Sequence, residues 1–206
     1  MPMLDIPAFI NTECSPVIIV DDFLREPEKW REQILALPEG FWFDHDELGR
    51  VADPTFLRDQ ITTFELMIGH LLRQVCTLTA WFSLRLDNEP DILNILDTSS
   101  LYDYFGVLYL SHSAPNGTGT VFLEHKKRLR ELTYDNLYFD EFEGLSLQEW
   151  SVYDTIANIY NRMVLFPGGR IARVLSGFGS SVEDGGLVQI FDVTRSGRRS
   201  DHGSSG

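Results

Sequence analysis

The sequence predicts an α+β fold in which helices come first and strands follow. Apolar residues recur at helical spacing in the first third of the chain, whereas short apolar runs bounded by turn-forming residues dominate from about residue 80 onward. Strands and helices do not alternate regularly, so a parallel sheet built from βαβ units is not expected. A length of 206 residues suits one domain, which we expect to span 1–193, followed by a polar tail over 194–206.

The helical part begins after a short apolar run over 17–20, which predicts a buried strand. Pro27 suits the first turn of a helix that runs to about Leu37. Apolar residues at helical spacing predict a second helix over 55–76. The stretch 40–54 mixes aromatics, acids and turn formers, so it is expected to be a loop.

The second half contains the strand signals. Ser146 and Glu149 form a capping-box pattern, which predicts one further helix running to about Tyr160. The highly charged stretch 126–144 is expected to be an insertion with helical character. Strands are predicted over 80–86, 104–110, 120–123, 163–166 and 187–193.

The charge of the chain restricts its partners. Lys and Arg number 17 against 31 Asp and Glu, which gives a net charge of −14. This field repels phosphate backbones and anionic lipid, so neither nucleic-acid nor membrane-surface binding is expected. A basic protein partner or a cationic substrate is compatible with the charge, which could equally serve solubility alone.

Two further features indicate a cytoplasmic protein. Cys14 and Cys76 are too few for a disulfide framework and form no metal-binding pair. No stretch approaches the roughly 20 apolar residues of a membrane span, and the first residues lack the pattern of a signal peptide.

Three segments, in this order, resemble the prolyl-hydroxylase-like branch of the 2-oxoglutarate/Fe(II) oxygenases, especially a small bacterial and phage group. They are Val17 to Leu24 with Pro27 behind it, Tyr104 to Leu110 followed by 119–122 and His125, and Asn161 to Phe166 followed by Gly186 to Phe191. The resemblance implies a double-stranded β-helix, a jelly-roll or cupin-like core, with the N-terminal helices packed on one sheet.

The chemistry of that family depends on an H-x-D pair on one strand and a distal His near the last strands. These three ligands hold Fe(II) and leave three coordination sites for 2-oxoglutarate and oxygen. Carried over onto this sequence, Asp97 matches the carboxylate, but Ile95 stands at the first His and Ala172 at the distal His. Asp97 is thus the one surviving metal position.

Members of the family also bind the 2-oxoglutarate carboxylate through an Arg or Lys that follows the distal His along the chain. Such a pair forms charge-assisted and often bidentate hydrogen bonds. Gly186 stands at that position. If the alignment with the family is shifted, Arg170 or Arg173 could be the basic residue that binds 2-oxoglutarate, although neither could replace an iron ligand.

A relocated metal site is a second possibility. His45 heads an H-x-acid pair with Glu47, and His112 or His125 could complete the ligand set. A solvated loop around His45 explains the same residues without a metal. His125 could alternatively lie on the substrate side of the site or simply pack in the core.

These positions predict a non-catalytic, pseudoenzyme domain on the oxygenase fold that serves as a binding or assembly module, with no cofactor. We expect a protein partner, which could contact the tail over 194–206, and a location in the cytoplasm or in a phage particle. The alternative is an active Fe(II)/2-oxoglutarate-dependent hydroxylase with a non-standard metal site. A metal-free cupin-like binder of small molecules would be a variant of the first hypothesis.

Overall fold

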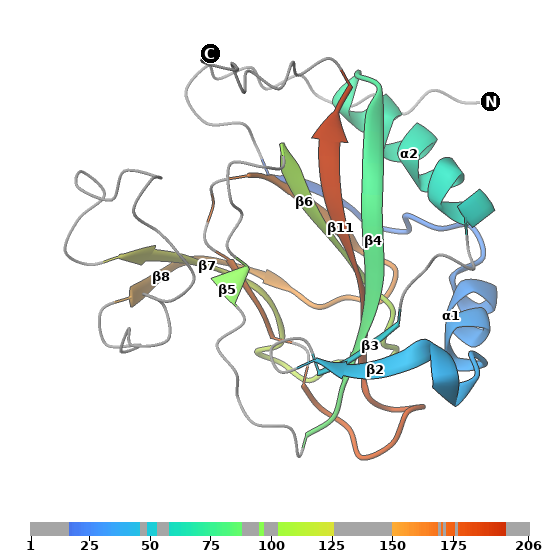
Figure 1. Ribbon diagram of the computed structural model, residues 1–206. Helices are drawn as coiled ribbons and strands as arrows, with labels where there is room; N and C mark the ends of the chain where they lie inside the picture. Colours follow the sequence, from blue (N-terminus) through green and yellow to red (C-terminus); the bar gives the residue numbers. More distant parts are fainter. Residues whose placement is uncertain are drawn as a thin grey trace, which may run out of the picture.

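Two antiparallel sheets face each other, and two helices cover the outer face of the larger sheet (Figure 1). This computed structural model describes residues 17–45, 49–52, 58–87, 95–96, 103–125, 150–168, 170, 172–175 and 177–196. The arrangement is the double-stranded β-helix with helices on one sheet that the sequence predicted.

The larger sheet has seven strands within the described part of the chain. In spatial order they are β1 (Ile18–Val20), β9 (Met163–Pro167), β6 (Tyr104–Tyr109), β11 (Gly186–Arg195), β4 (Cys76–Arg85), β3 (Gly49–Ala52) and β2 (Trp42–His45). All neighbouring strands pair antiparallel. The last described strand along the chain, β11, therefore lies in the middle of the sheet.

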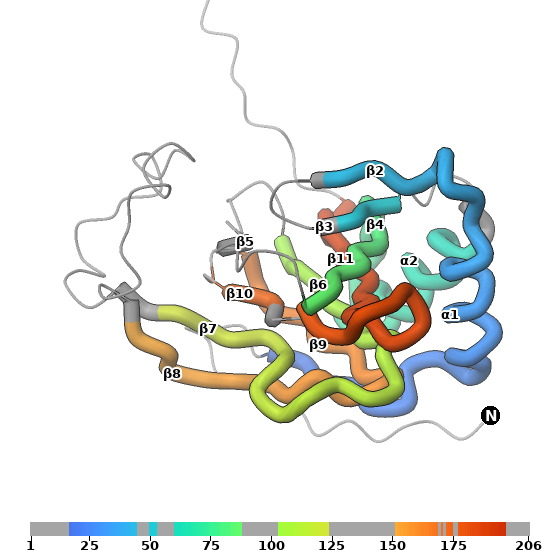
Figure 2. Tube along the Cα trace, turned by 90° about the horizontal axis from the view of Figure 1, so that it is seen from below, coloured from blue at the N-terminus to red at the C-terminus, as the bar shows by residue number. Residues whose placement is uncertain are grey.

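The smaller sheet has four described strands, in the order β5 (Ile95–Leu96), β10 (Ala172–Leu175), β7 (Gly119–His125) and β8 (Trp150–Ala157). They too pair antiparallel. Viewed from below, β7 and β8 lie on one side of the larger sheet and both helices on the other (Figure 2). The larger sheet is thus covered on both faces.

The helices α1 (Pro27–Leu35) and α2 (Arg58–Leu72) bury their apolar sides against the larger sheet, with a short 3-10 turn (Glu39–Phe41) after α1. Pro27 occupies the first turn of α1, as its fixed φ favours. Trp30 of α1 and Phe64 of α2 meet at a ring-centroid distance of 5.4 Å. Phe64 in turn contacts Phe191 of β11 at 5.3 Å, so aromatic packing joins both helices to the central strand.

Strand β11 shows how the two sides of the larger sheet are filled. Its residues alternate between the helical side, where Leu187 and Phe191 pack, and the interior between the sheets, where Val188 and Ile190 pack. A strand buried on both faces needs a nearly continuous apolar run, which is the pattern of this segment. The interior side is the surface that a barrel ligand would meet.

Two sequence predictions of local structure are wrong. The stretch 40–54, predicted as a loop, contains β2 and β3, which extend the larger sheet by pairing β3 with β4. The helix predicted to run to Tyr160 is instead strand β8 from Trp150. Its β-branched and aromatic residues favour a strand, and pairing along the whole of β7 outweighs a local capping pattern.

The boundaries of the other elements differ by a few residues from those predicted. The second helix begins at Arg58 and ends at Leu72, and Cys76 already belongs to β4. Strand β11 continues to Arg195, two residues into the predicted tail. The predicted insertion over 126–144 lies outside the described residues. Within the described ranges, no helix is long and apolar enough to cross a membrane.

Candidate functional site

A layer of five residues crosses the interior between the two sheets, at the level where β10 begins. Asp192 pairs with Phe105, and Phe105 pairs with Phe166. The ring of Phe166 meets the ring of Phe122 edge-on at a centroid distance of 5.2 Å, and Phe122 pairs with Ala172. We call these five residues the interior layer. It joins the central strand of the larger sheet to the distal-His position of the smaller one.

Asp192 is the charged member of the interior layer. It alternates with Val188 and Ile190, which both pack in the interior, so its side chain lies on that face. The residue is 5% exposed, and its Oδ1 has no hydrogen-bond partner among the described residues. Burial raises the pKa of the Asp192 carboxyl to about 7. This carboxylate is therefore costly to bury unless a proton or a cation accompanies it.

Trp81 places a second unpaired polar atom on the same face. It pairs with Ile190 and packs against the interior cluster. Its indole Nε1 is buried and lacks an acceptor in the described part of the structure. A donor and an acceptor thus lie unpaired on neighbouring strands, as at a site that receives a polar ligand.

Arg170 reaches the interior layer from the segment before β10. Its guanidinium carbon lies 5.8 Å from the ring centroid of Phe122, and Nη1 donates a hydrogen bond to the Tyr153 hydroxyl at 3.5 Å. Arg173 differs, because it alternates with Ala172 and Val174, which face the interior. Of the two predicted basic candidates, the structure therefore brings Arg170 to the layer.

The predicted metal positions lie on neighbouring strands. Leu96 of β5 is the cross-strand partner of Ala172, and Ile95 is the partner of Arg173. Ala172 is fully buried and has no side-chain donor atom. Asp97 follows directly after β5 in the sequence and lies outside the described residues. The strand that leads to Asp97 is thus hydrogen-bonded to the strand that begins at the distal-His position.

Gly186 does not share a layer with Ala172. It begins β11 opposite the buried Arg85, and Asp192 lies six residues further along the same strand (186 to 192). That spacing corresponds to about 20 Å. At the level of Ala172, β11 therefore carries an acid rather than the basic residue that the family requires.

The structure does not assemble the alternative metal set. His45 ends β2 at the edge of the larger sheet, whereas His125 ends β7 in the smaller sheet, and Glu47 lies outside the described residues. No group of three His, Cys, Asp or Glu side chains that could hold a metal occurs among the described side chains.

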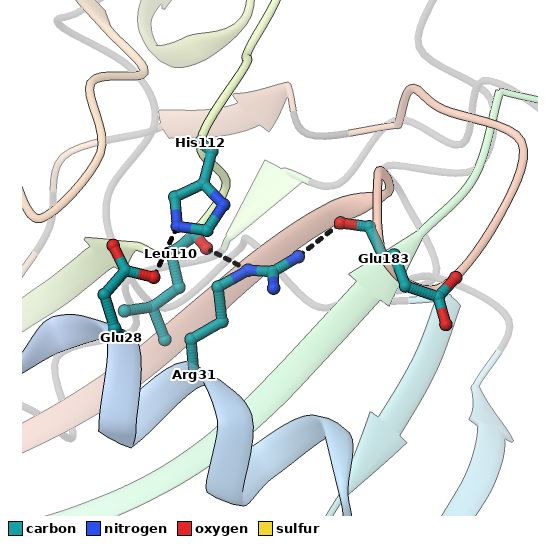
Figure 3. Close-up of polar contacts among 5 residues, drawn as sticks. All are labelled: Glu28, Arg31, Leu110, His112 and Glu183. Carbon is teal, nitrogen blue, oxygen red and sulfur yellow. Dashed lines mark hydrogen bonds and ion pairs between the residues drawn. The ribbon is translucent and has the colours of Figure 1, made fainter.

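A separate polar cluster ties α1 to the strands (Figure 3). The buried Arg31 donates through Nε to the Leu110 carbonyl at 3.0 Å and through Nη2 to the Glu183 carbonyl. Beside it, His112 Nε2 and Glu28 Oε2 lie 2.7 Å apart. The backbone acceptors of Arg31 indicate a structural role for this cluster.

A cleft of about 280 Å³ opens between α1 and α2 and is lined in part by Trp30 and Phe64. Both side chains pack on the helical side of the larger sheet. The cleft is therefore separated from the interior layer by that sheet.

Comparison with known proteins identifies the fold. No family model matches the sequence, and no curated protein matches it. Among solved structures, HygX from Streptomyces hygroscopicus with iron bound is 13% identical, with 89% of this chain and 84% of that chain covered and a TM-score of 0.53. A 2OG-Fe(II) oxygenase family oxidoreductase from Burkholderia pseudomallei is 11% identical, covering 87% and 85%, with a TM-score of 0.51.

HygX with nickel and 2-oxoglutarate bound is also similar, at 14% identity, with 87% and 83% covered and a TM-score of 0.50. A prolyl-4-hydroxylase from Pseudomonas putida is 14% identical over 87% of this chain and 92% of that chain, with a TM-score of 0.47. The matches with TM-scores of 0.50 or more give the protein the double-stranded β-helix fold of the 2-oxoglutarate/Fe(II) oxygenases, which confirms the fold that the resemblance implied.

Two functional expectations are wrong in the light of these structures. The chain was expected to be a non-catalytic binding or assembly module, but the proteins that share its fold include 2-oxoglutarate/Fe(II) oxygenases, which favours the alternative. The expectation that no cofactor is involved is contradicted in the same way, because HygX holds iron, or nickel with 2-oxoglutarate, in this fold.

Asp192 and Trp81 were not predicted from the sequence as site residues. A signal for Asp192 was present, because it is the one charged residue in the mostly apolar run over 187–193 that predicts β11. Its place in the alternation, two residues after Ile190, would have assigned it to the interior once the face of Ile190 was known. Trp81 gave no such signal, since an apolar aromatic is expected in a strand.

Proposed function

We propose that the protein is an Fe(II)- and 2-oxoglutarate-dependent oxygenase with a non-standard metal site. The observation that carries this proposal is the pairing of β5 with β10, which joins the strand before Asp97 to the strand beginning at Ala172. In the family that the sequence resembles, the metal ligands come from the two strands with these places in the chain. Here Ala172 has no donor atom, so a neighbouring strand, β7, is proposed to supply the second ligand.

The metal ligands are proposed to come from Asp97 and His125, with no contribution from position 172. Strands β5 and β7 both run antiparallel to β10, so they run in the same direction and end at the same side of the sheet. Asp97 follows the first of these strands, and His125 ends the second. A carboxylate and an imidazole are suitable ligands for Fe(II). The described residues do not supply a full ligand set.

Arg170 is proposed to bind a 2-oxoglutarate carboxylate. Its guanidinium lies against Phe122 of the interior layer, next to the proposed metal-binding strands. A guanidinium in that position offers the charge-assisted hydrogen bonds that a carboxylate accepts. Gly186 and Arg85 lie too far along β11 and β4 to serve the same layer.

Anaerobic titration with Mn(II), followed by electron paramagnetic resonance, tests the metal site, and succinate formation from 2-oxoglutarate tests turnover. We expect Asp97→Ala and His125→Ala each to weaken Mn(II) binding at least tenfold. Arg170→Met should instead raise the KM for 2-oxoglutarate with little change in Mn(II) affinity. Asp44→Asn, at an exposed position on β2, is the matched control. A wild-type protein that binds neither Mn(II) nor 2-oxoglutarate would contradict the proposal.

A protein partner that contacts the tail over 194–206, the single domain over 1–193 and a cytoplasmic location are further parts of this proposal. Residues 197–206 lie outside the described part of the chain. Pull-down with the full chain and with a chain ending at Ser196 would test the role of the tail.

A further inference from the structure

We infer that the interior layer binds the positively charged amine of a small molecule, with Asp192 as the counter-ion and the surrounding aromatic rings as the walls of the site. The assignment of this amine to the substrate rests on the proposed oxygenase function. The binding of the amine itself does not.

Asp192 is buried, and one of its carboxylate oxygens lacks a hydrogen-bond partner among the described residues. The residue is 5% exposed, and its Oδ1 is buried and meets no donor within the described residues. A buried carboxylate without a partner is strongly unfavourable, so natural proteins pair such groups with a cation or leave them protonated. Arg170, which lies against the Phe122 ring, donates a hydrogen bond to the Tyr153 hydroxyl at 3.5 Å. Because Asp192 Oδ1 has no hydrogen-bond partner among the described residues, that oxygen can accept a hydrogen bond from a ligand.

The interior layer contains three aromatic side chains that contact one another. Phe105 and Phe166 stack at a centroid distance of 6.2 Å, and Phe122 meets Phe166 edge-on at 5.2 Å. Aromatic rings attract desolvated ammonium groups, and rings arranged around a cation are a recurrent means of recognising amines. The Asp192 carboxylate and the phenylalanine rings of the layer together favour binding of an organic cation over a neutral or anionic group.

The side chains of the interior layer favour an amine over a metal ion as the ligand of Asp192. A divalent cation requires several oxygen, nitrogen or sulfur ligands. In the interior layer, Asp192 is the one residue with such an atom in its side chain, because the other four are Phe105, Phe122, Phe166 and Ala172. An alkylammonium needs a single carboxylate and tolerates apolar neighbours. The unpaired Trp81 Nε1 offers a hydrogen bond to an acceptor elsewhere on the ligand.

The charge of the whole chain acts in the same direction. A net charge of −14 raises the local concentration of cationic small molecules around the protein and repels anionic ones. The long-range field and the buried carboxylate therefore favour the same class of ligand.

The test uses the full chain with n-butylammonium as probe and n-butanol as its neutral counterpart, followed by saturation-transfer NMR and calorimetry. We expect n-butylammonium to bind at least tenfold more tightly than n-butanol. Asp192→Asn should abolish this preference, whereas Asp44→Asn should keep it. Equal binding of the two probes by wild type, or an unchanged preference in Asp192→Asn, would overturn the inference.

A metal titration distinguishes this inference from the proposed function. Loss of Mn(II) binding in Asp192→Asn would show that Asp192 is a metal ligand and would overturn the amine site. Retained Mn(II) binding and retained 2-oxoglutarate consumption, with the preference for n-butylammonium lost, is the expected result. A wild type that selects n-butylammonium but consumes no 2-oxoglutarate would reject the oxygenase proposal and support the amine site.

Discussion

Asp103 and Arg195 are joined by two hydrogen bonds that fasten the end of β11 to the residue before β6. Arg195 donates through Nη2 to Asp103 Oδ1 at 2.7 Å and through its backbone N–H to Oδ2 at 2.8 Å. The Asp103 N–H returns a bond to the Val193 carbonyl at 2.9 Å. The Asp103 side chain is 2% exposed, so its charge depends on this partner.

Arg195→Ala should destabilise the protein and loosen the end of β11. Because the Asp103 carboxylate stays buried while the Arg195 side chain is 44% exposed, we expect a loss of about 1–3 kcal/mol in the free energy of unfolding. Urea denaturation measures this loss, and amide exchange should rise at 193–195. Arg25→Ala, at an exposed position, should change the stability by less than about 0.5 kcal/mol. Equal effects of the two substitutions would contradict the prediction.

Arg31→Met should be more damaging than the equivalent change at Lys29 on the same helix. Arg31 is buried and satisfies the carbonyls of Leu110 and Glu183, which join α1 to two separate loops (Figure 3). Leaving those carbonyls without a donor costs about 2–4 kcal/mol. Lys29→Met removes only an exposed ion pair with Glu26 and should cost less than about 1 kcal/mol. Chemical denaturation of both variants decides whether the buried guanidinium holds α1 in place.

Asn161 should tolerate glycine better than alanine. Its side chain accepts from the Leu24 N–H and donates to the Leu24 carbonyl, each at 2.9 Å, and its φ is 61°. Both substitutions lose the two hydrogen bonds, at about 2–3 kcal/mol. Only alanine adds the cost of a left-handed backbone, about 1 kcal/mol. Thermal and urea unfolding should rank the proteins wild type, then Asn161→Gly, then Asn161→Ala, and a reversed order of the two variants would refute the backbone argument.

Asp192 should make the ligand-free protein less stable as the pH rises. Its pKa is raised from 3.8 to about 7 in the folded state, so the folded protein binds the proton more tightly than the unfolded chain does. The resulting stability is present in full below pH 4 and is lost as the pH rises to about 7. Relative to wild type, Asp192→Asn should therefore gain roughly 2–4 kcal/mol between pH 4 and pH 8. Parallel stability curves for the two proteins would show that Asp192 is already paired.

The sequence correctly predicted the elements whose pattern of apolar residues reflects their burial. It failed where the pairing of a strand with its neighbour determines the structure. Strands β6 and β9 are continuous apolar runs, and β11 is apolar apart from Gln189, Asp192 and its last two residues. Helix α2 shows the periodicity of a helix packed on one side. Strand β8 carried a capping pattern that its pairing with β7 overrides.

The candidate site was predictable only as a set of positions. The resemblance pointed to Ile95, Ala172 and Gly186, and the structure brings the strands of the first two together. The distance between Gly186 and the interior layer depends on the register of β11, which no local pattern encodes. Asp192 entered the layer for the same reason, through its pairing with Phe105.

The central position of β11 has a consequence for the order in which the chain folds. This strand hydrogen-bonds to both β4 and β6, yet among the described strands it comes last along the chain. A nascent polypeptide therefore lacks the middle of its larger sheet until residue 195 has been synthesised. Until then β4 and β6 have unpaired edges, and Trp30 of α1 lacks its acceptor, Gln189. Folding dominated by such distant pairings is slow and leaves strand edges exposed to aggregation. The larger sheet can therefore be completed only after the whole of β11 has been synthesised.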